Sequence, residues 1–371
     1  MARITLLSPT VASGDAIGND VLGMYRALKR EGHDVRMYAE GWNLTEPEVY
    51  AARDMEAHAV GDDAEDFLKN PSALLIYHHS IGWGLSRELL PKLRCKTVIK
   101  YHNVTPPEFF AGISADFVEM CRSGRDEMKS LVKLEHDLYL SDSEYNMLEL
   151  IEAGAPTSRN FVLPPFHHID VLDSVNPDLS VIDRYRTGRA NILTVGRVSP
   201  NKDHASLIEA FANYYYYYNS NSRLLIVGKQ DEAFKSYYER LGELVSSLCL
   251  DDAVVFTGGV TNEEMKAYYM IAHLFMITSK HEGFCVPLVE AMAMKLPILA
   301  YNSTAIPGTI GDAGIVWDER NPLLMAEAID CLMRDEALRA ELGEKGWRRY
   351  RTLFTNQKIE ESFLGALGKL I

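Results

Sequence analysis

The sequence is poor in cysteine and has no close pair of cysteines. Its 371 residues contain five, each far from the next along the chain: Cys95, Cys121, Cys249, Cys285 and Cys331. Their odd number and single spacing do not fit a disulfide framework, and zinc sites of the cysteine type need cysteines a few residues apart. The pattern therefore predicts reduced thiols in a cytoplasmic protein.

Long apolar runs are also missing. The first residues, MARITLLSPTVASGD, lack the apolar core of a signal peptide, and no apolar run reaches the roughly 20 residues that span a bilayer. We therefore expect a soluble, cytoplasmic protein that is at most peripheral to the inner face of the membrane. The segment 86–100, SRELLPKLRCKTVIK, has the basic and partly apolar character of a membrane-contacting face. An ordinary solvated helix before a strand explains this segment equally well.

Positive charge is in deficit. The chain has 38 Lys and Arg against 52 Asp and Glu, which gives a formal net charge of -14. No segment concentrates Lys and Arg as a nucleic-acid footprint does, so a nucleic-acid partner is excluded. A small phosphorylated ligand held by one or two local cations is still compatible with this composition.

Short apolar runs alternate with long amphipathic stretches from one end of the chain to the other. Examples are RITLLS, ALLIYH, NILTVG and RLLIVG. This alternation predicts an α/β protein with parallel sheets and helical crossovers. Because the chain is long for a single core, its length favours two domains.

The alternation is interrupted at residues 161–189, where three prolines and the absence of a clear period favour a linker. We therefore expect an N-terminal domain at residues 1–170 and a C-terminal domain at residues 171–350. Residues 351–371 read as an amphipathic helix that could pack back on the N-terminal domain.

The first candidate site is TVGRVSPNKD, residues 194–203. A strand ends there at Gly196 and is followed by Arg197 and Lys202. The carboxyl ends of strands in open α/β sheets face the ligand crevice, so two cations at this place suit a diphosphate. The alternative is a pair of solvated surface cations.

The second candidate site is SKHEGFCVPLVE, residues 279–290. It places Glu282 in a loop and Glu290 about one turn into a helix whose first residue we expect to be Pro287. Free amides at that helix N-terminus would offer an anion site, and Gly283 would let the backbone approach a ligand closely. Alternatively, Glu290 is an exposed acid stabilised by the helix dipole and Glu282 is an ordinary loop residue.

Six strings occur in order over residues 190–317: VGRVSPNKD, LLIVG, VVFTGGV, EEMKAYYMIAH, SKHEGFCVPLVEAMA and IPGTIGDAG. This series resembles the C-terminal domain of the family 4 (group 1) retaining glycosyltransferases of the GT-B fold, which have two Rossmann-like domains facing each other across a crevice. The spacing of Glu282 and Glu290 matches the E-x7-E motif of that family.

The resemblance implies roles for the matching residues. Glu282 would accept hydrogen bonds from hydroxyls of the donor sugar, Glu290 would bind the ribose, and Arg197 and Lys202 would neutralise the diphosphate. Cys285 is a departure, because the family more often has glycine there. The remaining donor-binding positions of this motif are Gly283, Phe284 and Leu288.

The N-terminal half resembles the same family more weakly. Gly14, in SPTVASGDAIGND, occupies the place of the glycine-rich loop that meets the phosphates, although strand-to-helix turns use glycine routinely. His102, in KYHNVTPPEFF, matches the family histidine near the donor sugar, where we expect it to position the sugar by hydrogen bonding. His78 and His79 follow another strand; one could line the acceptor side, and neither has a partner pattern that suggests a metal.

The resemblance implies a hexosyltransferase of polysaccharide or exopolysaccharide biosynthesis. The donor would be a nucleotide sugar, UDP-glucose first and GDP-mannose second, and the acceptor a saccharide or a lipid-linked saccharide. The catalytic residues would be His102, Arg197, Lys202 and Glu282. With no protein nucleophile evident, the acceptor hydroxyl would attack from the front face while the leaving phosphate takes the proton.

We expect neither a cofactor nor a metal ion at this site. Two other functions fit the same residues: a sugar-nucleotide 2-epimerase with the same two-domain plan, and a sensor that binds a sugar nucleotide without turning it over. The epimerase would act with no acceptor present. The sensor reading is disfavoured because the chain keeps both glutamates, both cations and His102.

Overall fold

The computed structural model describes residues 1–12, 14–55, 70–368 and 370–371. They divide into two compact units. Unit 1 contains Met1–Glu108, Asp116–His168 and Thr355–Ile371, and unit 2 contains Phe109–Ala115 and Ile169–Phe354. The last chain segment therefore belongs with the N-terminal half, and a short piece of the N-terminal half belongs with unit 2.

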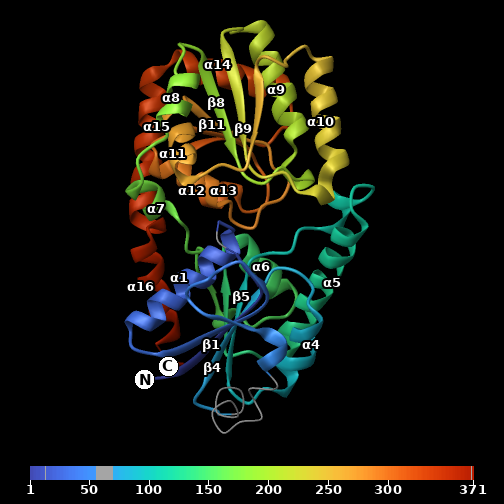
Figure 1. The fold of residues 1–371 in the computed structure, drawn as a ribbon, viewed down its shortest axis with the longest axis vertical. Helices are drawn as coiled ribbons and strands as arrows, with labels where there is room; N and C mark the ends of the chain where they lie inside the picture. The colour runs from blue at the N-terminus through green and yellow to red at the C-terminus, as the bar shows by residue number, and fades with distance from the viewer. Residues whose placement is uncertain (13, 56–69, 369) are drawn as a thin grey trace. The chain divides into compact units, whose positions relative to one another are not determined.

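Unit 1 is built on a seven-stranded sheet of order β3-β2-β1-β4-β5-β6-β7, in which each pair of neighbouring strands is parallel (Figure 1). Its described strands and α-helices are β1 (Arg3–Val11), α1 (Ala16–Arg30), β2 (Asp34–Trp42), β3 (Val49–Ala51), β4 (Leu74–His79), α4 (Gly84–Leu89), β5 (Lys96–Tyr101), α5 (Ala115–Leu131), β6 (Leu138–Ser141), α6 (Glu144–Glu152), β7 (Asn160–Val162) and α16 (Asn356–Leu367).

The strand order of unit 1 reverses between β1 and β4. In open parallel sheets the crevice outside the carboxyl ends at such a reversal is the usual ligand position. Helices cover both faces of the sheet, and all six residues of the central strand β4 are buried (Figure 1). Three candidate residues follow strands at this edge: Gly14 after β1, His78 at the end of β4 and His102 after β5.

The C-terminal helix α16 packs on α1 within unit 1. Its residues Ile359, Phe363 and Leu367 are buried in the same hydrophobic cluster as β1 and α1, and the ring of Phe363 meets that of Phe166 edge to face. An ion pair joins Arg30 of α1 to Glu360 of α16. This burial accounts for the assignment of residues 355–371 to unit 1.

Unit 2 is built on a six-stranded sheet of order β10-β9-β8-β11-β12-β13, again with parallel neighbours. Its strands and helices are α7 (Ile169–Ser174), α8 (Leu179–Tyr185), β8 (Ala190–Val195), α9 (His204–Tyr217), β9 (Ser222–Val227), α10 (Lys235–Ser247), β10 (Val254–Gly258), α11 (Asn262–Ile271), β11 (Leu274–Ile277), α12 (Val286–Ala293), β12 (Ile298–Tyr301), α13 (Ile306–Ile310), β13 (Gly314–Trp317), α14 (Pro322–Arg334) and α15 (Glu336–Arg349).

Alternate residues of the central strands of unit 2 enter two different cores. Leu193 and Val195 of β8 pack in the cluster of α11 and α12, whereas Ile192 packs in the cluster of α9, α10 and α14. Because strand side chains alternate between faces, both faces of β8 are covered by helices (Figure 1). The continuous apolar runs that predicted parallel sheets have this cause. The order reverses between β8 and β11, so the loops after these strands mark the ligand edge.

The segment 161–189 contains the change from unit 1 to unit 2, at His168 and Ile169, but the expected absence of regular structure is wrong. The segment contains the end of β7 and the helices α7 and α8. Its prolines lie between these elements rather than inside them, and the Asp178 side chain caps α8 by accepting from the Val181 amide at 3.1 Å. Helices this short leave too few residues for a clear period.

The segment 86–100 buries part of its apolar surface. Leu89 and Leu90 are buried and Leu93 is half-buried, while the exposed side chains include Arg87, Lys92 and Arg94. Among the described residues, no helix combines the length and the apolar character that crossing a membrane requires.

The backbone of Gly228, directly after β9, lies against the backbone of Gly196, directly after β8. A Cβ at position 228 would stand 1.9 Å from the Gly196 carbonyl oxygen. We therefore expect Gly228→Ala to lower the free energy of unfolding by about 2–3 kcal/mol. Gly242→Ala is the control: in α10 a Cβ meets nothing within 4 Å, and alanine there should stabilise by about 0.5–1 kcal/mol. Urea denaturation measures both, and equal effects of the two substitutions would contradict the close packing of these loops.

Candidate functional site

The loop after β8 carries the two cations of the first motif. Gly196 has φ of 142°, which a residue with a side chain rarely adopts, so glycine ends the strand there. Arg197 is exposed, and its guanidinium lies 5.7 Å from the ring centroid of Phe234. Lys202 ends the 3-10 turn η6 (Pro200–Lys202), in which proline occupies the first position.

Asn201 ties this loop to the loop after β11. Its carbonyl oxygen accepts from the Lys280 amide at 2.8 Å, and its side-chain amide donates to the His281 carbonyl at 3.0 Å. The Ser199 hydroxyl holds the Asn201 side chain by donating to Oδ1 at 2.7 Å. Since Asn201 precedes Lys202 and His281 precedes Glu282, these bonds fix the lysine and the glutamate relative to each other.

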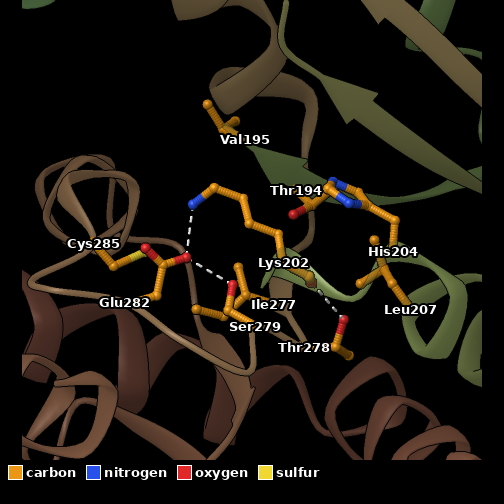
Figure 2. A pocket seen from close by; sticks show the side chains of 10 residues that line it. All are labelled: Thr194, Val195, Lys202, His204, Leu207, Ile277, Thr278, Ser279, Glu282 and Cys285. Atoms are coloured by element: carbon orange, nitrogen blue, oxygen red, sulfur yellow. Dashed lines mark hydrogen bonds and ion pairs between the residues drawn. The ribbon is translucent and has the colours of Figure 1, made fainter. Parts of the chain in front are cut away.

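Lys202 and Glu282 form a close ion pair. Lys202 Nζ lies 2.6 Å from Glu282 Oε1, and the Ser279 hydroxyl donates to the same oxygen at 2.7 Å (Figure 2). Burial lowers the pKa of Lys202, but the charge and hydrogen bond of Glu282, together with the nearby Cys285, outweigh burial, so the pKa is raised overall. The pair lies in a small pocket lined by Thr194, Val195, Lys202, His204, Leu207, Ile277, Thr278, Ser279, Glu282 and Cys285.

The loop that carries Glu282 is anchored from the next strand. The Glu282 amide donates to Thr304 Oγ1 at 2.8 Å, and the Thr304 hydroxyl donates back to the Glu282 carbonyl at 2.8 Å. Both main-chain groups of the glutamate are therefore occupied. This leaves its carboxylate as the group that can meet a ligand.

Arg320 holds the same region from the loop before α14. It donates to the carbonyls of Thr278 and Ser279 at 3.0 and 2.9 Å, and it pairs with Asp203 at 3.4 Å. Lys280 also pairs with Asp203, at 3.0 Å. The two cations and Asp203 therefore join the ends of β11 and η6 in a second, independent way.

The helix N-terminus at α12 offers fewer free amides than the sequence predicts. The helix begins at Val286, one residue earlier than expected, so Pro287 removes one amide from its first turn. The Leu288 amide already donates to the Cys285 carbonyl at 3.0 Å. The anion site would therefore depend more on Arg197 and Lys202 than on the helix.

Cys285 has φ of 73°, the left-handed conformation that favours glycine. Its side chain is buried in the pocket beside Glu282, and burial raises the pKa of its thiol. The thiol therefore stays protonated. It acts as a small apolar wall of the pocket.

Phe284 and Leu288 turn their side chains into the core of unit 2. The Phe284 ring packs edge to face on Phe354, and its carbonyl accepts from the Thr309 hydroxyl at 2.9 Å. Of the predicted donor-binding positions, these two can offer a ligand only main-chain groups. Gly283 lies between Glu282 and Phe284 and is half-buried.

Glu290 is buried in the second turn of α12. Its Oε2 accepts from the Tyr269 hydroxyl of α11 at 2.5 Å. Burial and the neighbouring carboxylate raise the pKa of Tyr269 well above its usual range, so this hydroxyl remains a donor. Glu290 is therefore not the exposed first-turn acid of the alternative reading.

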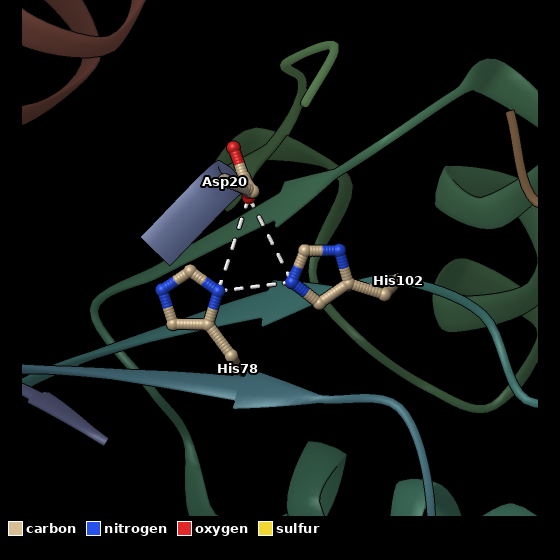
Figure 3. A group of neighbouring side chains, drawn as sticks. All are labelled: Asp20, His78 and His102. Atoms are coloured by element: carbon tan, nitrogen blue, oxygen red, sulfur yellow. Dashed lines mark hydrogen bonds and ion pairs between the residues drawn. The ribbon is translucent and has the colours of Figure 1, made fainter. Parts of the chain in front are cut away.

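The candidate residues of unit 1 lie at the carboxyl edge of its own sheet. Gly14 has φ of 78° and follows Ser13, which lies outside the described residues. His102 is nearly buried, and its Nδ1 lies 3.0 Å from Asp142 Oδ2. Its Nε2 lies 2.9 Å from His78 Nδ1 (Figure 3). Both ring nitrogens of His102 therefore have side-chain partners within unit 1.

The structure thus brings Lys202, Glu282 and Cys285 into one pocket of unit 2 and places Arg197 nearby at the same sheet edge. Sequence reasoning missed the residues that hold this arrangement together: Asn201, Asp203, Tyr269, Ser279, Thr304 and Arg320. Ser279, Asn201 and Asp203 stand inside the two motifs, so their polar side chains were a usable signal. Tyr269, Thr304 and Arg320 are far from the motifs along the chain, and no spacing connects them.

The left-handed backbone at position 285 predicts the effect of two substitutions. Cys285→Gly removes the cost of a side chain in this conformation, while Cys285→Ala removes the thiol and keeps that cost. We expect the glycine variant to be about 1 kcal/mol more stable than the alanine variant in urea denaturation. An alanine variant as stable as the glycine variant would show that the conformation at position 285 is not strained.

His204, at the start of α9, predicts a dependence of stability on pH. Burial and the nearby Lys202 charge lower its pKa to about 3. Because the unfolded chain binds a proton at a histidine near pH 6.5 and the folded chain does not in this range, stability falls as the pH drops. From pH 7.5 to 5.0 the wild type should lose about 2 kcal/mol more than His204→Gln. Urea denaturation at both pH values measures the difference, and equal losses would contradict it.

Comparison with known proteins shows what this part of the chain is similar to. Residues 180–349 match the family model described as glycosyl transferases group 1. The match includes both motifs, from the Arg197 loop to the Glu290 helix. It also includes Arg320, which anchors the Glu282 loop.

Curated relatives match about half of the chain. The GDP-mannose-dependent alpha-(1-6)-phosphatidylinositol monomannoside mannosyltransferase of Mycobacterium tuberculosis is 28% identical over 218 residues, which is 55% of this chain and 54% of the relative. The D-inositol 3-phosphate glycosyltransferase of Acidothermus cellulolyticus is 30% identical over 198 residues, 51% of this chain and 43% of the relative. The chain therefore spans about half the length of these relatives.

Solved structures align over nearly the whole chain. Anabaena Alr3699/HepE in complex with UDP and glucose has a TM-score of 0.77 at 16% identity, and all of both chains is covered. WaaG, a glycosyltransferase involved in lipopolysaccharide biosynthesis, has a TM-score of 0.73 at 15% identity, covering 98% of this chain and 100% of WaaG. At these identities the likeness shows the fold. Residues 180–349 are thus similar to the group 1 glycosyl transferases, and the two α/β units have the GT-B fold.

Proposed function

We propose that the protein is a retaining hexosyltransferase that takes its sugar from a nucleoside diphosphate donor bound at the carboxyl edge of the unit 2 sheet. The observation that carries this proposal is the Lys202–Glu282 pair of 2.6 Å, held at the strand-order reversal by Asn201. In this pair the Lys202 ammonium would bind a phosphate, and the adjacent Glu282 carboxylate would accept hydrogen bonds from sugar hydroxyls. Retention is carried over from the family.

Arg197 and Lys202 would stabilise the leaving diphosphate. As the bond from the anomeric carbon to the phosphate oxygen breaks, negative charge grows on the diphosphate. A fixed cation aimed at that oxygen stabilises the transition state more than the ground state. Lys202 is fixed by its loop, and its raised pKa keeps it charged. Arg197 and Lys202 would supply the positive charge on the diphosphate that a magnesium ion supplies in other nucleotide-binding enzymes.

Donor binding would exchange the partners within the pocket. In the protein alone, Lys202 and Glu282 neutralise each other. With the donor bound, Lys202 would turn to a phosphate oxygen and Glu282 would accept hydrogen bonds from hydroxyls of the sugar. A partly buried pair of this kind contributes on the order of 1 kcal/mol, so the donor can replace it at modest cost.

Glu290 would hold the ribose. Its Oε2 is occupied by Tyr269, which fixes the carboxylate in one orientation for a ribose hydroxyl. A buried acid held in this way loses little conformational entropy when the ligand arrives. Tyr269 is thereby a positioning residue for the nucleotide.

For the donor we propose GDP-mannose before UDP-glucose. The resemblance of motifs alone favours UDP-glucose, but the Mycobacterium relative is named as GDP-mannose-dependent, and it is similar in sequence over 55% of this chain. HepE is similar in fold only, so its UDP-glucose complex carries less weight. The acceptor would be a hydroxyl of a saccharide or lipid-linked saccharide, in keeping with the names of the relatives.

The acceptor hydroxyl would attack on the face from which the diphosphate leaves. Cys285 is the cysteine among the described residues lining the pocket, and its thiol is protonated because burial raises its pKa. A covalent enzyme intermediate on this thiol is therefore disfavoured. The leaving phosphate oxygen would take the proton of the acceptor.

The partner exchange predicts opposite effects of two substitutions on nucleotide binding. Glu282→Gln removes the carboxylate that competes for Lys202, so GDP or UDP should bind about fivefold more tightly. Lys202→Met should weaken binding of the same nucleotide about tenfold or more. Lys280→Met, which removes a neighbouring cation that pairs with Asp203, is the matched control. Calorimetric titration measures all three.

The same variants test the reaction. With GDP-mannose and UDP-glucose as donors, release of nucleoside diphosphate should fall about 100-fold in Lys202→Met and should also fall in Glu282→Gln. Only Glu282→Gln would then combine tighter nucleotide binding with slower turnover. Unchanged turnover in both variants, or tighter binding in Lys202→Met, would contradict the roles assigned to this pair.

A further inference from the structure

A buried cluster of charged and imidazole groups lies at the carboxyl edge of the unit 1 sheet. Asp20 comes from α1, His78 from the end of β4 and His102 from the residue after β5 (Figure 3). Lys100 and Asp142 complete the cluster; Lys100 Nζ lies 2.6 Å from Asp142 Oδ1. The side chains of Asp20 and His78 are fully buried, and that of His102 is 4% exposed.

The hydrogen bonds of the cluster fix its protons. The Asp142 carboxylate accepts, so His102 donates from Nδ1 across the 3.0 Å contact. His102 Nε2 then carries a lone pair, to which His78 Nδ1 donates at 2.9 Å. Three buried atoms of the cluster have no hydrogen-bond partner among the described residues: Asp20 Oδ2, His78 Nε2 and Asp142 Oδ1. Of these, Asp142 Oδ1 is paired with the Lys100 ammonium at 2.6 Å.

Three ligand atoms converge within the cluster. His78 Nδ1 and His102 Nε2 are 2.9 Å apart, and they lie 3.8 and 3.7 Å from Asp20 Oδ2. The point equidistant from three atoms with these separations lies about 2.0 Å from each of them, which is the bond length of zinc to histidine nitrogen and carboxylate oxygen in proteins. We propose that Asp20, His78 and His102 bind a divalent transition metal ion of the zinc type.

The surroundings of the three ligands support this site. Metal-binding histidines usually donate their other ring nitrogen to a carboxylate, as His102 does to Asp142. The second oxygen of Asp20 accepts from the Phe166 amide at 2.8 Å, which orients the carboxylate. Binding would give Asp20 Oδ2 the partner it lacks. It would also require the proton of His78 to move from Nδ1 to Nε2.

The charge of the cluster favours a cation. With both imidazoles neutral, the carboxylates of Asp20 and Asp142 and the ammonium of Lys100 sum to one negative charge. Lys100 is engaged mainly with Asp142 and with the Leu163 carbonyl, whereas it lies 3.8 Å from Asp20 Oδ2. Lys100 therefore interacts only weakly with Asp20 Oδ2, the oxygen that would bind the metal ion.

The site would have a consequence for His102. A bound ion takes the Nε2 lone pair, so His102 could no longer offer that nitrogen to a substrate. It would also join α1 to β4 and β5 and thereby stabilise unit 1. The proposal does not depend on the proposed transferase activity, and its test uses binding and spectra rather than turnover.

The experiment is a titration of Zn²⁺ into the full-length protein in competition with a chromophoric chelator. Wild type and His79→Gln should take up the same ion, while Asp20→Asn and His78→Gln should each lose it. His79 is the matched control because it is fully buried beside His78 yet contacts Gly124 and Glu127 instead. Circular dichroism establishes which variants are folded, and Asp20→Asn preserves the test if His78→Gln does not fold.

Co²⁺ provides a second measurement on the wild type. Bound by two imidazoles and a carboxylate, it should give visible ligand-field bands that Zn²⁺ displaces and Mg²⁺, which prefers oxygen ligands, does not. The bands should be missing in Asp20→Asn. Absence of Zn²⁺ uptake by the wild type, or uptake that the Asp20 and His78 substitutions leave unchanged, would overturn the proposal.

Discussion

The geometry of the candidate site depends on the tie between two loops that follow neighbouring strands. Asn201 bonds to the main chain of Lys280 and His281, directly before Glu282, and the 2.6 Å pair of Lys202 and Glu282 lies directly beside it. Since both loops start from strands buried on both faces, neither can shift without disturbing a core. The buried strands β8 and β11 therefore hold the side chains of Lys202 and Glu282 at a fixed distance from each other.

The fold and part of the site could be predicted from the sequence because their signals are local. Continuous apolar runs such as NILTVG follow directly from strands covered on both faces, and Arg197, Lys202, Glu282 and Glu290 stand at fixed spacings in two short motifs. The junction between the units does fall within 161–189, but its helices were missed because α7 and α8 are too short to show a period. The expectation of free amides at the start of α12 failed because the Leu288 amide already donates to the Cys285 carbonyl, and the sequence does not reveal this hydrogen bond.

Contacts between distant segments could not be predicted from one sequence. Tyr269 and Arg320 reach the site from separate elements, and no spacing in the chain connects them to Glu290 or to the Glu282 loop. The same holds for Asp20, His78 and His102, which the sheet of unit 1 brings together from α1, β4 and β5. His78 shows no metal pattern along the chain because its partners come from other elements.

The most direct measurement is a calorimetric comparison of a nucleoside diphosphate with the corresponding monophosphate, GDP against GMP and UDP against UMP, on the wild type and on Lys202→Met. The account predicts that the wild type prefers the diphosphate of one base and that Lys202→Met loses most of this preference while binding of the monophosphate changes little. Equal affinity for diphosphate and monophosphate in the wild type, or an undiminished preference in Lys202→Met, would contradict the central claim that this lysine meets the diphosphate of the donor.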